Sequence, residues 1–207
     1  MTTPLLTNEA DARRFVAGIA SAEAMERLES LCALLVEENR RQNLISRPSE
    51  SQIWLRHIAD SAQLLRFVPR ETSGQWLDLG TGAGFPGLVI AAIDPECDLT
   101  LVEARTRRVE WLLRAADALG LKRVRVAGTR LEQVPPFPAR IISARAFAPL
   151  PKLLQLSAPF STKATTYLLP KGRSAAQELQ EMPARIRRMF HVEQSLTDAE
   201  AGIIVSS

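Results

Sequence analysis

Apolar residues recur at intervals of three and four along the first third of the chain. The clearest run consists of Met25, Leu28, Leu31, Cys32, Leu35 and Val36. This spacing predicts an amphipathic helix, and Ser21 stands where its N-cap would lie. The helical pattern breaks at Pro48, resumes from Ile53 to Leu65, and ends near Pro69. We therefore predict that residues 1–70 form a helical N-terminal cap.

Beyond Gln75 the pattern changes, and short apolar runs alternate with amphipathic stretches. The apolar runs predict strands at residues 75–79, 98–102, 123–127, 140–144, 165–169, 191–194 and 202–205. Helices are predicted at 105–119, near 150–156, and at the basic stretch 174–188. This alternation is typical of an α/β fold, in which a mainly parallel sheet has helices on both faces. We predict such a domain over residues 71–207.

The first predicted strand leads into a loop with alternating glycines. Asp78 lies at the strand tip, and Pro86 opens the apolar helix that follows. Between them stand the glycines Gly80, Gly82 and Gly84. Glycine permits positive φ and lets a ligand lie against bare main chain, and proline in a first helical turn loses only a donor that has no partner. The loop therefore has the form of a nucleotide-binding turn, and a turn without a ligand is the simpler alternative.

Two kinds of nucleotide ligand fit this loop. Gly82-x-Gly84-x-x-Gly87 matches the dinucleotide fingerprint, with Glu103 after the next strand as the ribose acid. Asp78 favours a different ligand, because a carboxylate would oppose a pyrophosphate but would suit a cationic amino-acid end. S-adenosylmethionine has such an end and no phosphate, and a charge-assisted hydrogen bond typically contributes about 1.5–3 kcal/mol. The sequence thus favours S-adenosylmethionine over a nicotinamide or flavin nucleotide, with Glu103 on its ribose.

Composition narrows the class of protein only a little. The 207 residues are 46% hydrophobic and 24% charged, which is ordinary for a soluble globular protein. No apolar run reaches the ~18–20 residues that span a bilayer, and no signal peptide is evident. Cys32 and Cys97 are the only cysteines, so we predict reduced thiols and a cytoplasmic location. The net charge of +3 does not identify a partner by itself.

Sheets of this kind bind ligands at the carboxyl ends of their strands. That rule places Asp78, Gly80, Glu103, the turn at 129–132 and Arg145 on one rim. Methyl transfer to pyrimidine C5 would need a cysteine nucleophile, and neither cysteine falls on this rim. Transfer to exocyclic amines generally accompanies an Asn/Asp-Pro-Pro-aromatic loop, which the segment after the fourth strand lacks. Guanine N7 has a free lone pair, so positioning and electrostatics suffice without a base.

Four motifs resemble those of the bacterial 16S ribosomal RNA guanine-N7 methyltransferases, the glucose-inhibited division protein B family. They are Asp-Leu-Gly-Thr-Gly-Ala-Gly-Phe-Pro-Gly at 78–87, Arg-His-Ile-Ala-Asp-Ser at 56–61, Ser-Ala-Arg-Ala-Phe at 143–147 and Leu-Pro-Lys-Gly at 169–172. The resemblance implies a Rossmann-like class I S-adenosylmethionine-dependent methyltransferase fold and methylation of one guanine N7 in 16S rRNA. It also implies cofactor contacts from Gly80, Phe85, Leu131, Glu132 and Arg145, although Leu131 and Glu132 could instead belong to a simple turn.

A second group of residues is predicted to face the RNA substrate. It comprises Arg56, His57, Asp60, Ser61 and, at a later strand end, Lys171. The 56–61 segment precedes the first strand and can fold over the rim as a gate or wall, whereas Arg56 and Asp60 could simply pair with each other. His57 could be a base, an RNA contact or a packed core residue, and the catalytic version is the least favoured because N7 needs no base. Arg145 and Lys171 could meet phosphates or guanine O6.

We therefore predict no catalytic base and no metal, with Arg145 and His57 as candidate positioning residues. The substrate would be 16S rRNA or the small ribosomal subunit, and the protein a monomer. Two alternatives remain open: a nicotinamide-dependent oxidoreductase that uses the same glycines, and a non-catalytic RNA-binding protein on the same fold. Binding of NAD rather than S-adenosylhomocysteine would identify the first, and RNA affinity without methyl transfer would identify the second.

Overall fold

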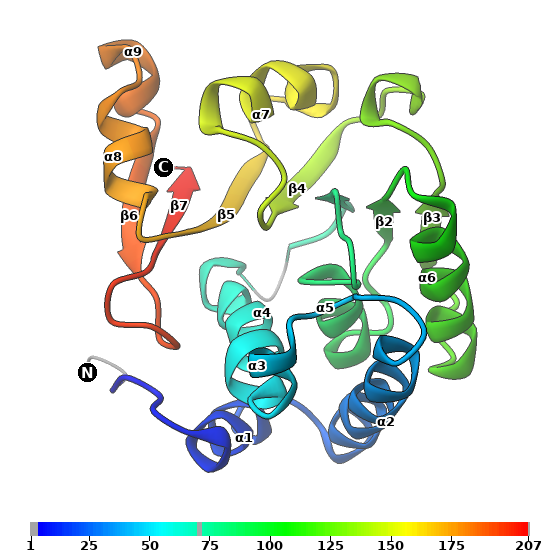
Figure 1. Ribbon diagram of the computed structural model, residues 1–207. Coiled ribbons are helices and arrows are strands. Elements are labelled where there is room, and N and C mark those ends of the chain that lie inside the picture. Colours follow the sequence, from blue (N-terminus) through cyan, green and yellow to red (C-terminus); the bar gives the residue numbers. More distant parts are fainter. Residues whose placement is uncertain (1–3, 70–71, 207) are drawn as a thin grey trace.

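The computed structural model describes residues 4–69 and 72–206. Its centre is one seven-stranded sheet with the order β3-β2-β1-β4-β5-β7-β6 (Figure 1). The strands are β1 (Gln75–Leu79), β2 (Leu99–Val102), β3 (Val124–Ala127), β4 (Ala139–Ala144), β5 (Thr166–Gly172), β6 (Phe190–Gln194) and β7 (Gly202–Ser206). The first five run parallel, whereas β7 is antiparallel to both β5 and β6. The predicted α/β fold is confirmed.

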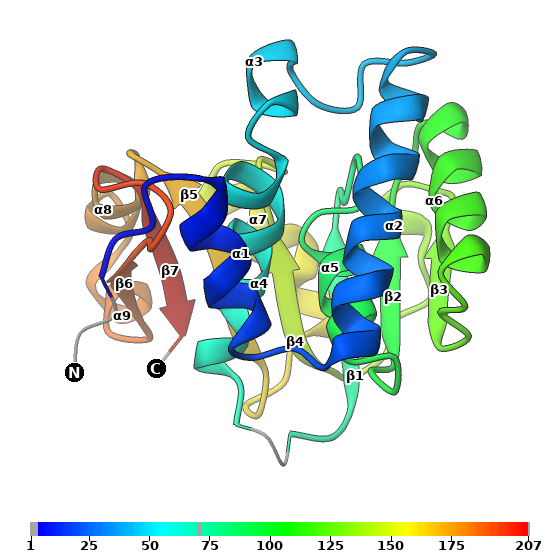
Figure 2. The ribbon, with the colours of Figure 1, turned by 90° about the horizontal axis from the view of Figure 1, so that it is seen from below.

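Helices cover both faces of this sheet. One face carries α1 (Glu9–Ala17), α2 (Ala22–Asn39), η1 (Trp54–Ala59), α4 (Asp60–Ala62), η2 (Gln63–Phe67), α5 (Gly87–Ile93) and α6 (Thr106–Ala118). The other carries η3 (Leu131–Gln133), α7 (Leu150–Ser157), η4 (Ala158–Phe160), α8 (Ala175–Gln180) and α9 (Ala184–Arg187). The short helix α3 (Arg47–Glu50) projects from the end of α2 by a long loop (Figure 2).

The N-terminal helices share a hydrophobic core with the sheet. Leu28 of α2 lies in the same cluster of buried side chains as Leu88 of α5 and Leu99 of β2. The Arg27 side chain also donates to the Ala92 carbonyl at the end of α5, with an N–O distance of 2.8 Å. Residues on both sides of position 70 therefore build one core. The division into a cap and a methyltransferase domain at that position stays a prediction.

Local signals place some helix ends correctly and one incorrectly. Ser21 caps α2 as predicted, because its Oγ accepts a hydrogen bond from the Ala24 amide at 3.2 Å. The predicted basic helix at 174–188 is wrong, since the structure has two short helices there, α8 and α9. Pro183 separates them, because proline has no amide hydrogen to donate and disfavours helical geometry at the residue before it. Within residues 4–69 and 72–206, no helix is long and apolar enough to cross a membrane.

Candidate active site at the carboxyl edge of the sheet

Strand register brings three of the predicted site residues together. Leu79 at the end of β1 is paired with Val102 of β2 on one side and with Ala144 of β4 on the other. The next residue of each strand is therefore Gly80, Glu103 or Arg145, and the three stand side by side at the carboxyl edge. The predicted convergence at this edge is therefore confirmed for the ends of β1, β2 and β4.

The glycines of the 80–84 loop are required by backbone geometry. Gly80, Gly82 and Gly84 have φ values of +61°, +60° and +103°, a region that side chains rarely tolerate. A β-carbon on Gly80 would collide with the Phe147 ring, and one on Gly84 would collide with Leu88. Gly82 differs, because the nearest atom to its β-carbon position is a guanidinium nitrogen of Arg108 at 3.5 Å. Arg108 of α6 therefore supplies the only side-chain atom that lies within 4 Å of this position among the described residues.

Asp78 faces inward and supports the loop. Its side chain is fully buried, and Oδ2 accepts from the Gly87 amide at 3.1 Å while Oδ1 accepts from the Ser143 hydroxyl at 2.7 Å. Burial raises the pKa of this carboxyl to about 6, against the lowering effect of these hydrogen bonds. Sequence reasoning placed Asp78 in direct contact with the cofactor. The structure instead points its carboxylate at the base of the loop, because Asp78 shares a strand face with buried Trp76.

Three main-chain amides at the turn into α5 have partners within the chain. The Gly84 and Phe85 amides donate to the Thr81 carbonyl at 2.9 and 3.1 Å, and the Gly87 amide donates to Asp78. A dinucleotide site would need such amides free for a pyrophosphate. These three amides are therefore not free for a pyrophosphate, which counts against the oxidoreductase alternative.

Glu103 and η3 form the side of the site near β2 and β3. Glu103 is nearly buried, its Oε1 accepts from the Arg105 amide at 2.9 Å, and its Oε2 lies 3.6 Å from Nη1 of Arg108. Leu131 is buried and Glu132 exposed in η3, after the end of β3. Glu103 thus has one oxygen fixed by the main chain and one directed toward the Arg108 guanidinium, an arrangement suited to a hydroxyl ligand.

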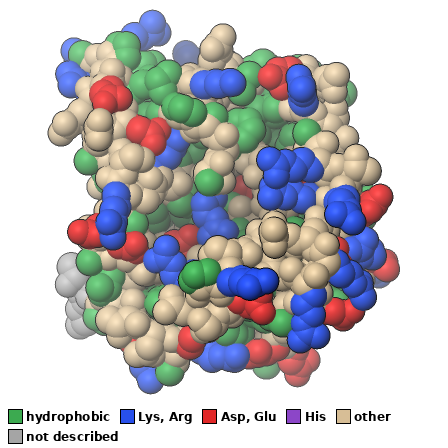
Figure 3. Space-filling view, viewed as in Figure 1, with side chains coloured by type: hydrophobic (Ala, Val, Ile, Leu, Met, Phe, Trp, Pro, Cys, Tyr) green, Lys and Arg blue, Asp and Glu red, His purple; other side chains and the backbone are tan. Residues whose placement is uncertain are grey.

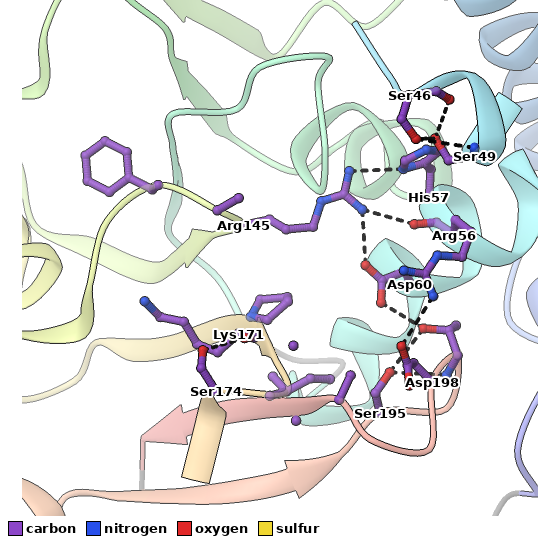
Figure 4. Close-up of a pocket in the computed structure, with 18 of the residues that line it drawn as sticks. Ser46, Ser49, Arg56, His57, Asp60, Arg145, Lys171, Ser174, Ser195 and Asp198 are labelled. Carbon is purple, nitrogen blue, oxygen red and sulfur yellow. Dashed lines mark hydrogen bonds and ion pairs between the residues drawn. The ribbon is translucent and has the colours of Figure 1, made fainter. Parts of the chain in front are cut away.

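Arg145 is held from three directions at the end of β4 (Figure 4). Its Nη1 donates at 3.1 Å both to Oδ2 of Asp60 and to the Arg56 carbonyl. Its Nη2 lies 3.2 Å from Nδ1 of His57, and its Cζ lies 5.1 Å from the centre of the Phe85 ring. The 56–61 segment therefore does fold against the rim, as the sequence predicts, and its contact there is with Arg145.

His57 is a neutral, packed histidine. Its ring stacks on Phe85 with centroids 5.0 Å apart and planes 10° apart. Burial, with the charges of Arg145 and Arg56, lowers the pKa of His57 to about 3. Because a guanidinium only donates, Nδ1 accepts from Arg145 and the ring hydrogen sits on Nε2. A histidine in this state is a poor general base at neutral pH.

A pocket of about 870 Å³ opens beside this cluster. Its walls include the predicted substrate residues Arg56, His57, Asp60 and Lys171, together with Arg145. The surface is hollowed between the N-terminal helices and the C-terminal strands, with basic side chains around the hollow (Figure 3). The pocket volume lies in the range of small-molecule sites.

Two predicted substrate residues have internal partners. The Lys171 side chain is 8% exposed, and its Nζ donates to the Ala148 carbonyl at 2.6 Å and pairs with Oε2 of Glu178 at 2.9 Å. Ser61 is 1% exposed and donates to the His57 carbonyl at 2.6 Å, within the helix. Ser61 therefore does not line the pocket, because its hydroxyl points along the helix rather than outward. Lys171 lines the pocket with its charge already paired.

Several residues of the site were not found by sequence reasoning. Thr197 donates to Oδ1 of Asp60 at 2.8 Å, and Ser195 lies 3.1 Å from Thr197. Asp198 lies 3.4 Å from a guanidinium nitrogen of Arg56. These residues belong to the loop between β6 and β7, about 137 residues from Asp60 in the chain. No local pattern could indicate them.

Neither thiol belongs to this edge. Cys32 lies within α2, and Cys97 lies before β2, in a second cavity of about 560 Å³ at the amino ends of the strands. Burial raises the pKa of both thiols to about 12. They are therefore protonated near neutral pH and cannot act as nucleophiles there. Among the described residues, no group of three or more His, Cys, Asp or Glu side chains is placed to hold a metal ion.

Solved structures of low sequence identity share this fold. A precorrin-6y C5,15-methyltransferase from Geobacter metallireducens superposes with a TM-score of 0.54 at 11% identity, over 80% of this chain and 91% of that one. An S-adenosylmethionine-dependent methyltransferase from Aquifex aeolicus gives 0.53 at 16% identity, over 70% and 87%. The chain has the Rossmann-like fold of class I methyltransferases.

Sequence comparison specifies the family. A relative from Erythrobacter litoralis named ribosomal RNA small subunit methyltransferase G is 58% identical over 97% of each chain. A relative of the same name from Novosphingobium aromaticivorans is 55% identical over 97% of this chain and 88% of its own. The family model for rRNA small subunit methyltransferase G matches residues 24–202. The chain belongs to that family, and the family resemblance predicted from its motifs is confirmed.

Proposed function

We propose that this protein transfers a methyl group from S-adenosylmethionine to N7 of a guanine in 16S rRNA. The observation that carries the proposal is the alignment of Gly80, Glu103 and Arg145 along one strand edge, beside a pocket whose histidine, His57, is already bonded to Arg145. Membership of the rRNA small subunit methyltransferase G family supports the same conclusion. A cytoplasmic monomer that acts on 16S rRNA or on the small subunit is part of this proposal.

The residues at the edge fit the proposed cofactor. The bare backbone of Gly80, Gly82 and Gly84 would accept its methionyl end, and Glu103 would accept hydrogen bonds from the ribose hydroxyls. Leu131 and Glu132 would lie beside the adenine, and Phe85 and Arg145 would close the opposite side. Asp78 acts indirectly in this proposal, because it accepts from the Gly87 amide and so fixes the shape of the loop. S-adenosylmethionine supplies a methyl group activated by a sulfonium.

The residues around the pocket fit an acceptor that has no proton to remove. His57 is neutral and committed to Arg145, and the nearest carboxylate, Asp60, is also committed to Arg145. The chain's own contribution is therefore orientation: Arg145 at a fixed position, and the exposed Arg56 nearby for phosphate contact. Guanine must leave the RNA stack to enter such a pocket, which is how single-stranded RNA loops are generally read.

Nucleoside mass spectrometry of 16S rRNA tests the substrate. RNA from cells lacking this protein should lose one 7-methylguanosine, and the purified protein with labelled S-adenosylmethionine should restore it. An unchanged level of 7-methylguanosine would make the substrate assignment wrong. RNA binding without any label transfer would instead favour the non-catalytic alternative. NAD binding without S-adenosylhomocysteine binding would favour the oxidoreductase.

A further inference from the structure

Arg108 reaches from α6 into the edge where the cofactor is proposed to bind. Its Nη1 lies 3.6 Å from Oε2 of Glu103 and 3.5 Å from the position that a β-carbon of Gly82 would take. The side chain is 26% exposed, so the guanidinium borders the site without being locked in the core. It is the cation that stands between the proposed ribose acid and the loop backbone.

Helix stability does not explain an arginine at this place. Arg108 lies in the first turn of α6, where a positive charge is unfavourable next to the helix dipole. The same turn contains Arg107 but no acidic residue, and the N-cap Arg105 makes no side-chain capping bond. We therefore look for the role of Arg108 in a contact outside the helix.

The chemistry of the proposed cofactor indicates which group Arg108 would contact. S-adenosylmethionine carries two cationic groups, several neutral ones and a single anion, the α-carboxylate of its methionyl end. The ribose hydroxyls would compete with the Arg108 guanidinium for Oε2 of Glu103. A guanidinium beside the glycine loop matches that carboxylate in charge and can form bidentate bonds with it.

We propose that Arg108 binds the α-carboxylate of S-adenosylmethionine and exchanges Glu103 for it when the cofactor enters. The proposal rests on the proposed function, since it takes S-adenosylmethionine as the ligand. It adds a cofactor-binding residue in α6 to those that the motifs indicate. The ion pair of Arg108 with Glu103 keeps both groups in position before the cofactor arrives.

Calorimetric titration with two ligands that differ only in this carboxylate tests the proposal. The ligands are S-adenosylmethionine and decarboxylated S-adenosylmethionine, and the proteins are wild type, Arg108→Gln and Arg108→Lys. Wild type should prefer the carboxylated ligand by about tenfold or more, the value of one charge-assisted bond. Arg108→Gln should lose that preference, and Arg108→Lys should retain part of it.

Arg107→Gln is the matched control, because Arg107 is an exposed neighbour in the same helix turn. It should keep the wild-type preference, and melting temperatures should show that all variants fold. If Arg108→Gln keeps the preference, or weakens both ligands equally, Arg108 does not bind the carboxylate. If wild type binds neither ligand, the proposed cofactor is wrong, which is a different failure from that of Arg108.

Discussion

At the scale of single residues, the raised pKa of Asp78 makes the stability of the fold depend on pH. Its pKa is about 6 in the folded protein and 3.8 in an ordinary aspartate. Because the folded-state pKa is the higher one, this group favours folding fully below pH 3.8. That contribution is lost as pH rises through 6.

We therefore expect wild type to lose stability relative to Asp78→Asn as pH rises from 4 to 7. A difference of about two pKa units corresponds to about 3 kcal/mol, and urea unfolding at a series of pH values measures it. The exposed Asp117→Asn variant should run parallel to wild type. Parallel curves for Asp78→Asn as well would mean that the carboxyl titrates normally.

Sequence reasoning located these residues better than it oriented them. Gly80, Glu103 and Arg145 were placed on one rim because strand ends are local features that the apolar pattern reveals. The direction of Asp78 was predicted wrongly, although alternation along β1 puts it on the same face as Trp76 and beneath α5. Ser61 was predicted to face the substrate, but its hydroxyl donates to the His57 carbonyl in its own helical segment. A motif identifies residue types, whereas their direction depends on packing.

At the scale of elements, η1 depends on an acid from another helix. Oε2 and Oε1 of Glu9 accept from the Trp54 and Leu55 amides at 3.0 and 2.8 Å. Ile53, the residue before η1, provides no side-chain cap. Glu9 of α1 therefore performs the capping that a serine or aspartate in sequence would normally provide.

Glu9→Gln should destabilise the protein by about 1–2 kcal/mol, because one of these amides loses a charged acceptor. Chemical denaturation measures the change, and hydrogen exchange should show faster opening at residues 54–59. Glu26→Gln serves as the comparison, because Glu26 is an exposed acid of α2 whose carboxylate has no hydrogen bond or ion pair among the described residues. Equal effects of the two substitutions would show that Glu9 caps nothing.

Features that depend on neighbouring residues could be predicted from the sequence, whereas contacts between residues far apart in the chain could not. The strands, the Ser21 cap and the loop arise from neighbouring residues and were predicted from them. The capping of η1 by Glu9 joins residues 45 and 46 apart, and no periodic pattern records such a pairing. The division of the predicted helix at 174–188 was predictable in principle, because Pro183 stands inside it.

At the scale of the whole molecule, Asp60 links three distant segments. It accepts from Arg145 at the end of β4 and from Thr197 in the loop before β7. Gln63, one turn after Asp60, accepts from the Leu196 amide at 2.8 Å. The position of Arg145 thus depends on residues near the far end of the chain.

Thr197→Val should lower kcat/KM for RNA by about tenfold, because Asp60 loses a charge-assisted bond and holds Arg145 less firmly. Single-turnover methylation measures the loss. Combining it with Asp60→Asn should add little, since both changes act on one network. Glu200→Gln, which removes an exposed ion pair in the same loop, should leave the rate unchanged. Additive losses would show that Thr197 acts independently of Asp60.

The link between Asp60 and Thr197 also has a consequence for the protein's own synthesis. Arg145 leaves the ribosome about fifty residues before Thr197 does. Strands β1 to β4 precede Arg145 in the chain, whereas β5 and the loop that carries Thr197 follow it, so the guanidinium lacks its complete set of neighbours during that interval. The loop that holds Asp60 through Thr197 is therefore the last part of this network to be synthesised.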